Sequence, residues 1–168
     1  MSPVSLSTSD STYILATGKA KLWLLLVGVN SYQDENLPSL RYSAVDCQGL
    51  GDALTEAARE FPQKQVIIHH DFAAQTPTLE TVRTSLAEII LAAKPQDTVL
   101  FYLSGHGVLE LQTQQAVLCL SDTQKDDLLN TALKVQELLQ MLGSCAAHQQ
   151  LVWLDACHSG SMTLRGSR

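Results

Sequence analysis

Short apolar runs recur along the chain, separated by longer segments in which apolar residues fall at helical spacing. The longest run, Leu22 to Val29, is continuous and ends at Asn30-Ser31-Tyr32. A continuous run of this length predicts a strand buried on both faces, although periodicity alone does not exclude a buried helix. Shorter apolar runs follow at Gln65 to His69, Val99 to Leu103, Ala116 to Leu120 and Gln150 to Leu154.

Three helices are predicted between these runs, and a polar loop is expected from Ser121 to Asp127. Strands and helices that alternate in this way favour βαβ units, and therefore an α/β fold with a mostly parallel sheet and helices on both faces. The helices cover Tyr42 to Ala58, a segment from Thr78-Leu79-Glu80 to Pro95, and Val135 to Leu142. Their expected apolar stripes are Val45, Leu50, Ala53, Leu54 and Ala57 in the first and Val82, Leu86, Ile89, Ile90 and Ala93 in the second.

The composition indicates a single domain and limits its partners. With 168 residues, 45% of them hydrophobic, the chain is long enough for one core but too short for two ordinary domains. Met1 to Thr12 is rich in Ser and Thr, so we expect residues 1–20 to form a loose arm and residues 21–168 the domain. The net charge of -6 argues against nucleic-acid binding.

Neither membrane contact nor secretion is expected. The longest apolar run is about half a membrane span, and the N-terminus lacks the pattern of a signal peptide. The four cysteines lie far apart without a Cys-x-x-Cys motif, so we expect neither a zinc site nor a disulfide framework. A reducing, cytoplasmic location fits best. Three of the cysteines are expected to be core residues: Cys47, Cys119 and Cys145.

Two of the apolar runs end at small residues beside a reactive side chain. One leads into Ser104-Gly105-His106-Gly107, and the other into Asp155-Ala156-Cys157-His158-Ser159-Gly160. Parallel strands present their carboxyl ends at one edge of a sheet, where sites form in open α/β folds. If the two strands are neighbours, His106 and Cys157 can meet there. A thiolate nucleophile and an imidazolium that protonates the leaving amine suffice for amide hydrolysis.

Other interpretations of these residues stay open. His158 follows Cys157 directly and is an alternative base, but adjacent residues on an extended chain point apart. Gly105 and Gly107 would allow a tight turn and close approach of a substrate backbone. His69-His70-Asp71 resembles a metal cluster, but no further ligands are evident, and we interpret it as a strand-end loop.

The two motifs, taken in order, resemble the large subunit of caspase-like cysteine peptidases, and more closely that of metacaspases and their prokaryotic relatives, the orthocaspases. The resemblance spans roughly Leu22 to Gly160 and includes Leu25-Leu26-Val27-Gly28-Val29-Asn30 and the segment Leu40 to Leu50. It implies a three-layer caspase-like fold, with residues 21–168 as the large-subunit domain.

The resemblance also implies a mechanism. His106 and Cys157 match the family's catalytic dyad, and the backbone N–H groups of Gly107 and Cys157 match its oxyanion hole. Backbone N–H groups at such turns are the usual donors to an oxyanion. The chain is therefore expected to be an endopeptidase that works through an acyl-enzyme intermediate.

Metacaspase-type enzymes cut after Arg or Lys, using an acidic first substrate pocket, S1, and by this resemblance the chain is expected to cut after Arg and less readily after Lys. The family's pocket positions fall here on Ser43, Asp46, Ser104 and Asp155. Two carboxylates would give an Arg side chain charge-assisted partners. Alternatively, Asp46 is a capping or solvated helix residue and Asp155 a structural residue that orients the turn. The pocket interpretation predicts peptide or protein substrates with a basic residue before the cleaved bond.

Many metacaspases also need calcium, and here the sequence departs from the family. Asp122 could supply one ligand, and Asp126 and Asp127 are further weak candidates. The helix start that should carry an acidic pair reads Leu133-Lys134-Val135-Gln136-Glu137, and a Lys opposes cation binding. We expect neither a metal nor another cofactor, with Asp126 and Asp127 in a solvated loop.

The family further implies a small subunit, cut from the same precursor, that would remain paired with this chain. Arg165 and Arg168 are the candidate autocleavage positions, with a simple boundary of the sequence as the alternative. The competing function is a catalytically inactive caspase-like scaffold for protein interactions, because fold alone never proves activity. A caspase-like enzyme with another preference before the cleaved bond is disfavoured by Asp46 and Asp155.

Overall fold

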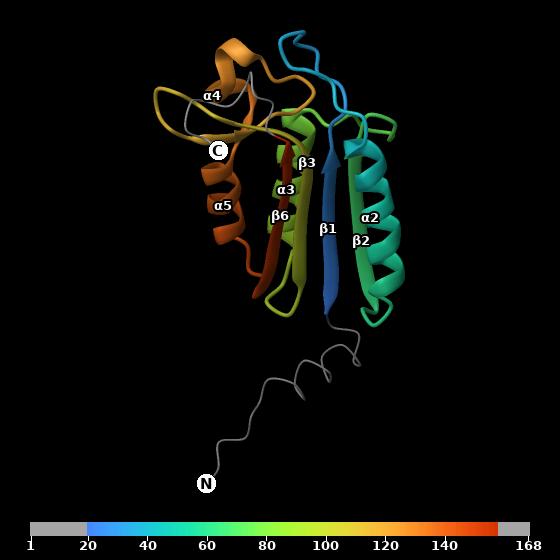
Figure 1. The fold of residues 1–168 in the computed structure, drawn as a ribbon. Coiled ribbons are helices and arrows are strands. Elements are labelled where there is room, and N and C mark those ends of the chain that lie inside the picture. The colour runs from blue at the N-terminus through green and yellow to red at the C-terminus, as the bar shows by residue number, and fades with distance from the viewer. Residues whose placement is uncertain (1–19, 158–168) are drawn as a thin grey trace.

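The computed structural model describes residues 20–157, and a parallel sheet forms its centre. In spatial order the strands are β2 (Gln63–His70), β1 (Lys21–Gly28), β3 (Thr98–Leu109) and β6 (Gln149–Cys157). All three pairings between these neighbours are parallel. Figure 1 shows these four strands side by side with their carboxyl ends at the same edge. The expected mostly parallel sheet is confirmed.

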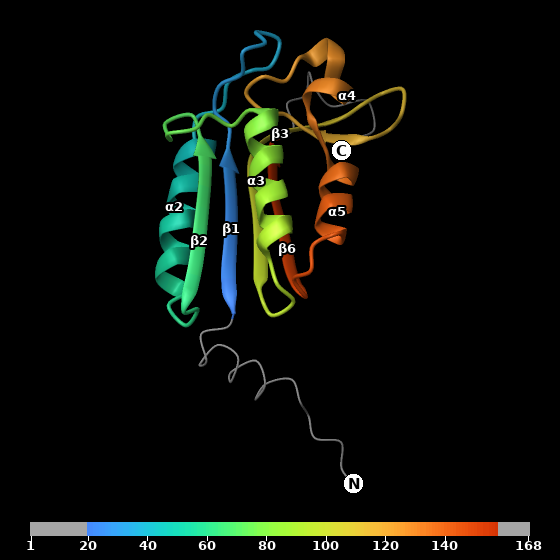
Figure 2. The ribbon, with the colours of Figure 1, turned by 180° about the vertical axis from the view of Figure 1, so that it is seen from behind.

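Helices cover both faces of this sheet, as the alternating pattern predicts. α2 (Ser43–Ala57) lies on one face over β1 and β2, whereas α3 (Leu79–Ala92) and α5 (Val135–Gly143) lie on the other (Figures 1 and 2). The continuous apolar run of β1 contributes side chains to the cores on both faces of the sheet. Leu22, Leu24 and Leu26 pack on the α2 side, while Trp23, Leu25 and Val27 pack on the α3 side.

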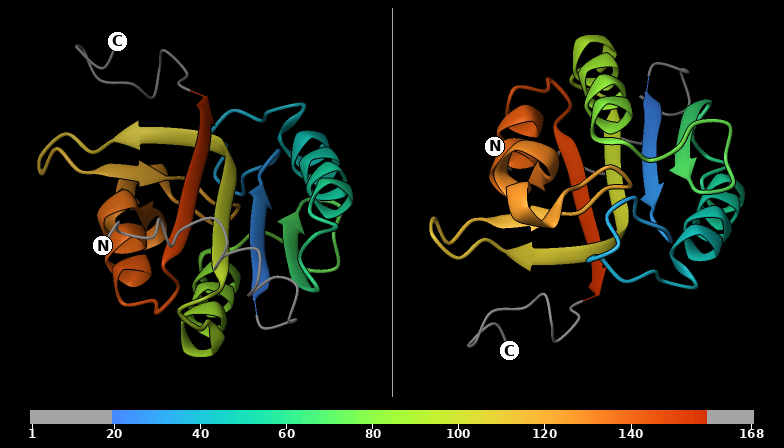
Figure 3. Two further views of the ribbon diagram at one scale, coloured as in Figure 1. Left: turned by 90° about the horizontal axis from the view of Figure 1, so that it is seen from below. Right: turned by 90° about the horizontal axis from the view of Figure 1, so that it is seen from above.

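The strand that carries His106 is longer than predicted. The sequence pattern places its end at Leu103, with a glycine-rich turn after it, but β3 continues to Leu109. Its last part pairs antiparallel with β4 (Ala116–Leu118), which in turn pairs with β5 (Leu133–Lys134). Figure 3 shows this part of β3 bending away from the main sheet. Gly105 is the register partner of Ala156 on β6 and Gly107 that of Leu118 on β4, so both glycines lie in extended strand and no turn forms there.

Two other predictions are corrected. The expected polar loop Ser121 to Asp127 ends in a short 3-10 helix, η1 (Lys125–Asp127), which is followed by α4 (Leu128–Thr131). In α2 the expected stripe is confirmed for Leu50 and Leu54, which are partly buried and pack against the core, and is wrong for the other members, since Val45 is 60% exposed and Ala53 and Ala57 are also exposed. The fully buried residues of α2 are small: Ser43, Ala44, Cys47 and Gly51. In α3 the predicted stripe is confirmed, because its members are buried or packed against the core.

β6 leaves apolar surface uncovered on the α2 side of the sheet. Because β3 and β6 pair in register, Leu151 and Trp153 of β6 lie beside Leu100 and Tyr102 of β3. α2 does not reach this far, and Leu151 is 56% and Trp153 48% exposed. Among the described strands, β6 pairs only with β3. This edge and face therefore remain open in the described part of the chain.

Between residues 20 and 157, no helix has the length and apolar character needed to cross a lipid bilayer.

Gly28, at the end of β1, should be intolerant of a side chain. A Cβ at this position would lie 2.7 Å from the Cys47 Cβ and would also meet the Ser43 carbonyl oxygen. We predict that Gly28→Ala lowers the free energy of unfolding by about 1–3 kcal/mol through overpacking. Gly49→Ala is the matched control, because Gly49 is exposed on α2 with nothing within 4 Å of an added Cβ. It should raise stability by up to about 1 kcal/mol.

Urea unfolding of both variants measures the two effects. Equal changes in the free energy of unfolding for Gly28→Ala and Gly49→Ala would contradict the close approach of α2 to β1.

Candidate active site

The structure brings His106 and Cys157 together through strand pairing. The parallel register of β3 and β6 makes their Cα atoms direct partners. Neighbouring strands in a sheet lie about 4.8 Å apart. The two residues are therefore adjacent at the carboxyl edge of the main sheet, although they are far apart in sequence. The side chain of Cys157 and residues 158–168 lie outside the described part, so the positions of His158, Gly160, Arg165 and Arg168 stay untested.

His106 is buried, and the loop that follows β1 holds its imidazole. The side chain is 1% exposed. Its Nε2 lies 2.6 Å from the carbonyl oxygen of Pro38. Because a carbonyl can only accept, Nε2 carries a proton, and the neutral ring then has its lone pair on Nδ1. This is the tautomer in which Nδ1 acts as the base.

Tyr32, on the same loop, contacts both the backbone and the ring of His106. The His106 N–H donates to the Tyr32 hydroxyl at 2.9 Å. The two rings lie with centroids 5.1 Å apart and planes inclined by 34°. Gly105 permits this contact, because a Cβ there would lie 3.0 Å from the Tyr32 hydroxyl oxygen. Tyr32 and Pro38 were not expected to belong to the site, since nothing in the apolar pattern links them to His106.

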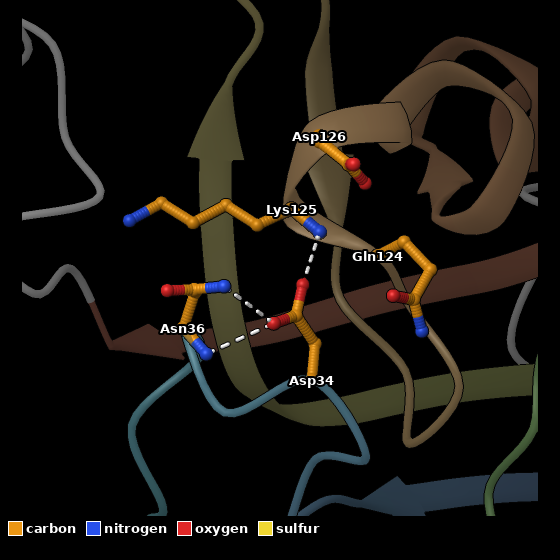
Figure 4. Close-up of a pocket in the computed structure, with 5 residues that line it drawn as sticks. All are labelled: Asp34, Asn36, Gln124, Lys125 and Asp126. Carbon is orange, nitrogen blue, oxygen red and sulfur yellow. Dashed lines mark hydrogen bonds between the residues drawn. The ribbon is translucent and has the colours of Figure 1, made fainter.

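The loop itself is tied to the fold by two carboxylates. Asp71, just after β2, accepts the N–H groups of Asn30 and Ser31 at 2.7 and 2.8 Å. Asp34 accepts the Lys125 N–H at 2.7 Å and the Asn36 N–H at 2.9 Å, as Figure 4 shows. These two backbone donors, Lys125 first, lower the pKa of Asp34. The loop that holds His106 is thus connected to both β2 and η1.

The four residues predicted for the substrate pocket lie on one side of the sheet. The Ser104 hydroxyl, on β3, donates to the Ser43 hydroxyl, on α2, at 3.0 Å, and both side chains are buried. Asp155 is the register partner of Ser104 on β6 and is exposed. Asp46 lies in the first turn of α2, three residues after Ser43, and is also exposed. The structure therefore gathers these residues at the carboxyl edge, beside the pair His106 and Cys157.

The calcium candidates have other contacts. An oxygen of Asp122 accepts the N–H of Leu79 at the start of α3, at 3.0 Å. Asp127 accepts a hydrogen bond from the side chain of Asn130 at 2.8 Å. Asp126 is exposed and lines a pocket with Asp34, Asn36, Gln124 and Lys125 (Figure 4). Among residues 20–157, no three His, Cys, Asp or Glu side chains are grouped so that they could hold a metal ion.

The other reactive side chains belong to the core. Cys47, Cys119 and Cys145 are buried and unpaired, which confirms the prediction for them. Burial raises the pKa of both the Cys47 and the Cys119 thiol to about 12, so neither supplies a thiolate near neutral pH. His69 is also buried, with its Nε2 2.7 Å from the Ser85 hydroxyl, and burial lowers its pKa. His69 and His70 lie within β2 rather than in a loop after it.

Comparison with known proteins gives a consistent picture. The sequence profile of the caspase domain, a family of peptidases, matches residues 21–167 of this chain. The chain is similar to metacaspase-1 of Meyerozyma guilliermondii, with 27% identity over 107 residues, which are 62% of this chain and 26% of that protein. It is also similar in structure to a protein of Geobacter sulfurreducens, with a TM-score of 0.64 and 20% identity. That match covers 88% of this chain and 58% of the other.

The chain thus spans about a quarter of the metacaspase and little more than half of the Geobacter chain. At this low identity the structural match bears on the fold alone.

The bonds that Asp34 accepts predict a pH-dependent contribution to stability. Because the folded pKa lies below the ordinary value of 3.8, the contribution is present above that value and is lost as the pH falls through the folded pKa. Asp34→Asn should therefore be less stable than the wild type at pH 7. The difference should be smaller at about pH 2.5, because part of this contribution is lost as the Asp34 carboxyl takes up a proton.

Urea unfolding at the two pH values measures this difference. Asp126→Asn, which removes an exposed carboxylate from the same pocket, is the matched control for the change of charge alone. A stability difference for Asp34→Asn that persists undiminished at low pH would contradict the assignment.

Proposed function

Because the chain belongs to the caspase-domain family of cysteine peptidases, we propose that it is an endopeptidase that cuts after Arg, and less readily after Lys. Cys157 is the nucleophile and His106 the base. The observation that carries this proposal is the register of β3 and β6, which makes these two residues direct neighbours. The contact between His106 Nε2 and the Pro38 carbonyl supports it, because the lone pair of the neutral ring is then on Nδ1.

In the proposed reaction, Nδ1 of His106 takes the proton of the Cys157 thiol, and the thiolate attacks the carbonyl carbon of the substrate. The carbonyl oxygen becomes an oxyanion, to which the backbone N–H groups of Gly107 and Cys157 donate. The tetrahedral intermediate collapses as the imidazolium gives its proton to the departing amine. Water, deprotonated by the neutral His106, then hydrolyses the thioester and restores the thiol.

The preference for Arg follows from the charges of the candidate pocket. Asp46 and Asp155 are carboxylates on either side of the buried pair Ser43 and Ser104. A guanidinium presents five N–H donors in a fixed plane and can bond to several oxygens at once, whereas an ammonium is a compact point charge. Two negative charges favour either cation over the Asp side chain that a basic pocket would select.

We further propose that the reaction needs no calcium and no other cofactor. Asp122 and Asp127 accept hydrogen bonds from Leu79 and Asn130, and Lys125 stands next to Asp126. Calcium prefers six to eight oxygen ligands and is disfavoured near a positive charge.

A second segment, the small subunit of the same precursor, is proposed to cover the open side of β6. Leu151 and Trp153 are about half exposed there, and contiguous exposed apolar surface beside an unpaired strand edge usually marks an interface. An Arg-specific enzyme could release that segment by cutting after its own Arg165 or Arg168, which follow β6 in the sequence.

Peptide cleavage tests the proposal. Peptides that differ only in carrying Arg, Lys or Asp before the cleaved bond should be cut in the order Arg, then Lys, with no cleavage after Asp. Cys157→Ala should lower the rate at least ~1000-fold, since no other group supplies the nucleophile. The assay uses the full-length protein, so that any subunit that completes the site is present.

Cleavage only after Asp would refute the acidic pocket. Activity that survives in Cys157→Ala would refute the assignment of Cys157 as the nucleophile. Absence of all cleavage would favour the alternative function, an inactive scaffold for protein interactions.

A further inference from the structure

The first turn of α2, which carries two residues of the candidate pocket, is capped by a residue from another segment. The backbone N–H of Ala44, in that turn, donates to Oδ1 of Asn30 at 2.9 Å. The first N–H groups of a helix have no partner inside it. Tyr42, which precedes α2, makes no capping bond with its side chain in the described part of the chain. Asn30, two residues after the end of β1, therefore takes the place of an N-cap side chain.

Asn30 is itself held in place. It is 8% exposed. Its backbone N–H donates to the Asp71 carboxylate at 2.7 Å, and its carbonyl oxygen accepts the N–H of Leu40 at 2.7 Å. The side-chain nitrogen makes a longer contact of 3.5 Å with the carbonyl oxygen of Arg41. Because the backbone is bound on both sides and the side chain is buried, Oδ1 is presented to α2 from a fixed position.

The capped turn carries the helical part of the candidate pocket. Ser43 and Asp46 lie on either side of Ala44 in the sequence of this turn. The N–H of Asp46 donates to the carbonyl oxygen of Tyr42 at 2.8 Å, which closes the turn. A displacement of Ala44 would therefore move both pocket residues with it.

The strand part of the pocket is joined to the same point. The N–H of Val29, directly before Asn30, donates to the carbonyl oxygen of Ser104 on β3 at 2.9 Å. The hydroxyl of Ser104 in turn donates to the hydroxyl of Ser43 at 3.0 Å. Residues 29 and 30 thus bind β3 through the backbone and α2 through the Asn30 side chain. The relative position of the two sides of the pocket depends on these bonds.

We propose that Asn30 is a positioning residue for substrate specificity, because its side chain fixes the start of α2, and with it Asp46, relative to β3. The inference rests on the proposed pocket, but not on catalysis. The planar fork of Arg requires acceptors at set places, whereas the three donors of Lys rotate to find them. A loosened first turn of α2 should therefore weaken binding of Arg more than binding of Lys.

Substitution of the side chain separates this role from the support of His106. The bonds of Asn30 to Asp71 and Leu40 are made by its backbone, which a change of side chain retains. Asn30→Ala removes the acceptor of the Ala44 N–H. Asn30→Asp keeps an oxygen of the same reach and adds a negative charge near the start of a helix, which is favourable.

The test is a binding measurement in the Cys157→Ala background of the full-length protein. N-acetyl-arginine amide and N-acetyl-lysine amide are titrated by NMR. We expect Asn30→Ala to bind the arginine compound about 3- to 10-fold more weakly, the value of one hydrogen bond, and to change the affinity for the lysine compound by less than about 2-fold. Asn30→Asp should bind the arginine compound at least as tightly as the parent protein.

Thr78→Ala is the matched control. The Thr78 side chain caps α3, where it accepts the N–H of Thr81 at 3.2 Å, so its removal costs a helix cap away from the pocket. Both affinities should stay unchanged in this variant. If Asn30→Ala does not fold, Asn30→Ser replaces it, because the oxygen of Ser lies one bond closer to the backbone and falls short of Ala44.

With the active cysteine present, Asn30→Ala should raise KM for Arg peptides and leave kcat unchanged. The rate at which iodoacetamide alkylates Cys157 should also stay unchanged, since this reagent carries no side chain for the pocket. General loss of structure would lower kcat and would not produce this division.

An unchanged arginine affinity in Asn30→Ala would overturn the inference, as would an equal loss in Asn30→Asp or Thr78→Ala, or failure of the parent protein to bind the arginine compound. Selective, Asn30-dependent binding without any peptide cleavage would support the inference and refute the proposed peptidase. Cleavage after Arg with an arginine affinity independent of Asn30 would support the peptidase and refute the inference.

Discussion

The in-register parallel pairing of β3 and β6 is the constraint on which the candidate site depends. It sets His106 opposite Cys157 and, two residues earlier, Ser104 opposite Asp155. Side chains alternate between the faces of a strand. A shift of β3 against β6 by one residue would therefore leave the two members of each pair on opposite faces of the sheet. The buried residues of β3, Phe101 among them, resist such a shift because it would expose them. The same packing that stabilises the core therefore positions the proposed chemistry.

A second constraint comes from the loop between β1 and α2. Pro38 and Tyr32 of this loop hold the ring and backbone of His106, and Asp34 and Asp71 fasten the loop to neighbouring segments. A catalytic side chain needs such support, because misplacement by about 1 Å can cost a large part of the rate. The loop thus fixes the position of His106 at the carboxyl edge of the main sheet.

Much of this arrangement could be predicted from the sequence. The apolar runs located the four parallel strands, and the two motifs at their ends identified His106 and Cys157. The extension of β3 could not be predicted, because Gly105 and Gly107 are weak strand formers and only pairing with distant segments, β6 for Gly105 and β4 for Gly107, keeps them extended. Val45 was wrongly assigned to the core because Gly28 lets α2 approach through its small residues instead.

The contacts of Tyr32 and Tyr102 were also beyond sequence reasoning. Both depend on segments that are distant in the chain: Tyr32 reaches His106 across the edge of the sheet, and Tyr102 meets Trp153 on the neighbouring strand. An apolar pattern predicts which side chains are buried, but it does not predict which residue each of them contacts. A tyrosine just after the first strand and another before Ser104 were the only signals available.

The central claim, that β3 and β6 set His106 beside a nucleophilic Cys157, is tested most directly by covalent labelling. The full-length protein is treated with a peptidyl acyloxymethyl ketone that carries Arg, and the modified residue is located by mass spectrometry of the digested protein. We predict a single label on Cys157 that is lost in His106→Ala. A label on another residue, such as Cys145, or a label on Cys157 that forms equally fast without His106, would contradict the claim.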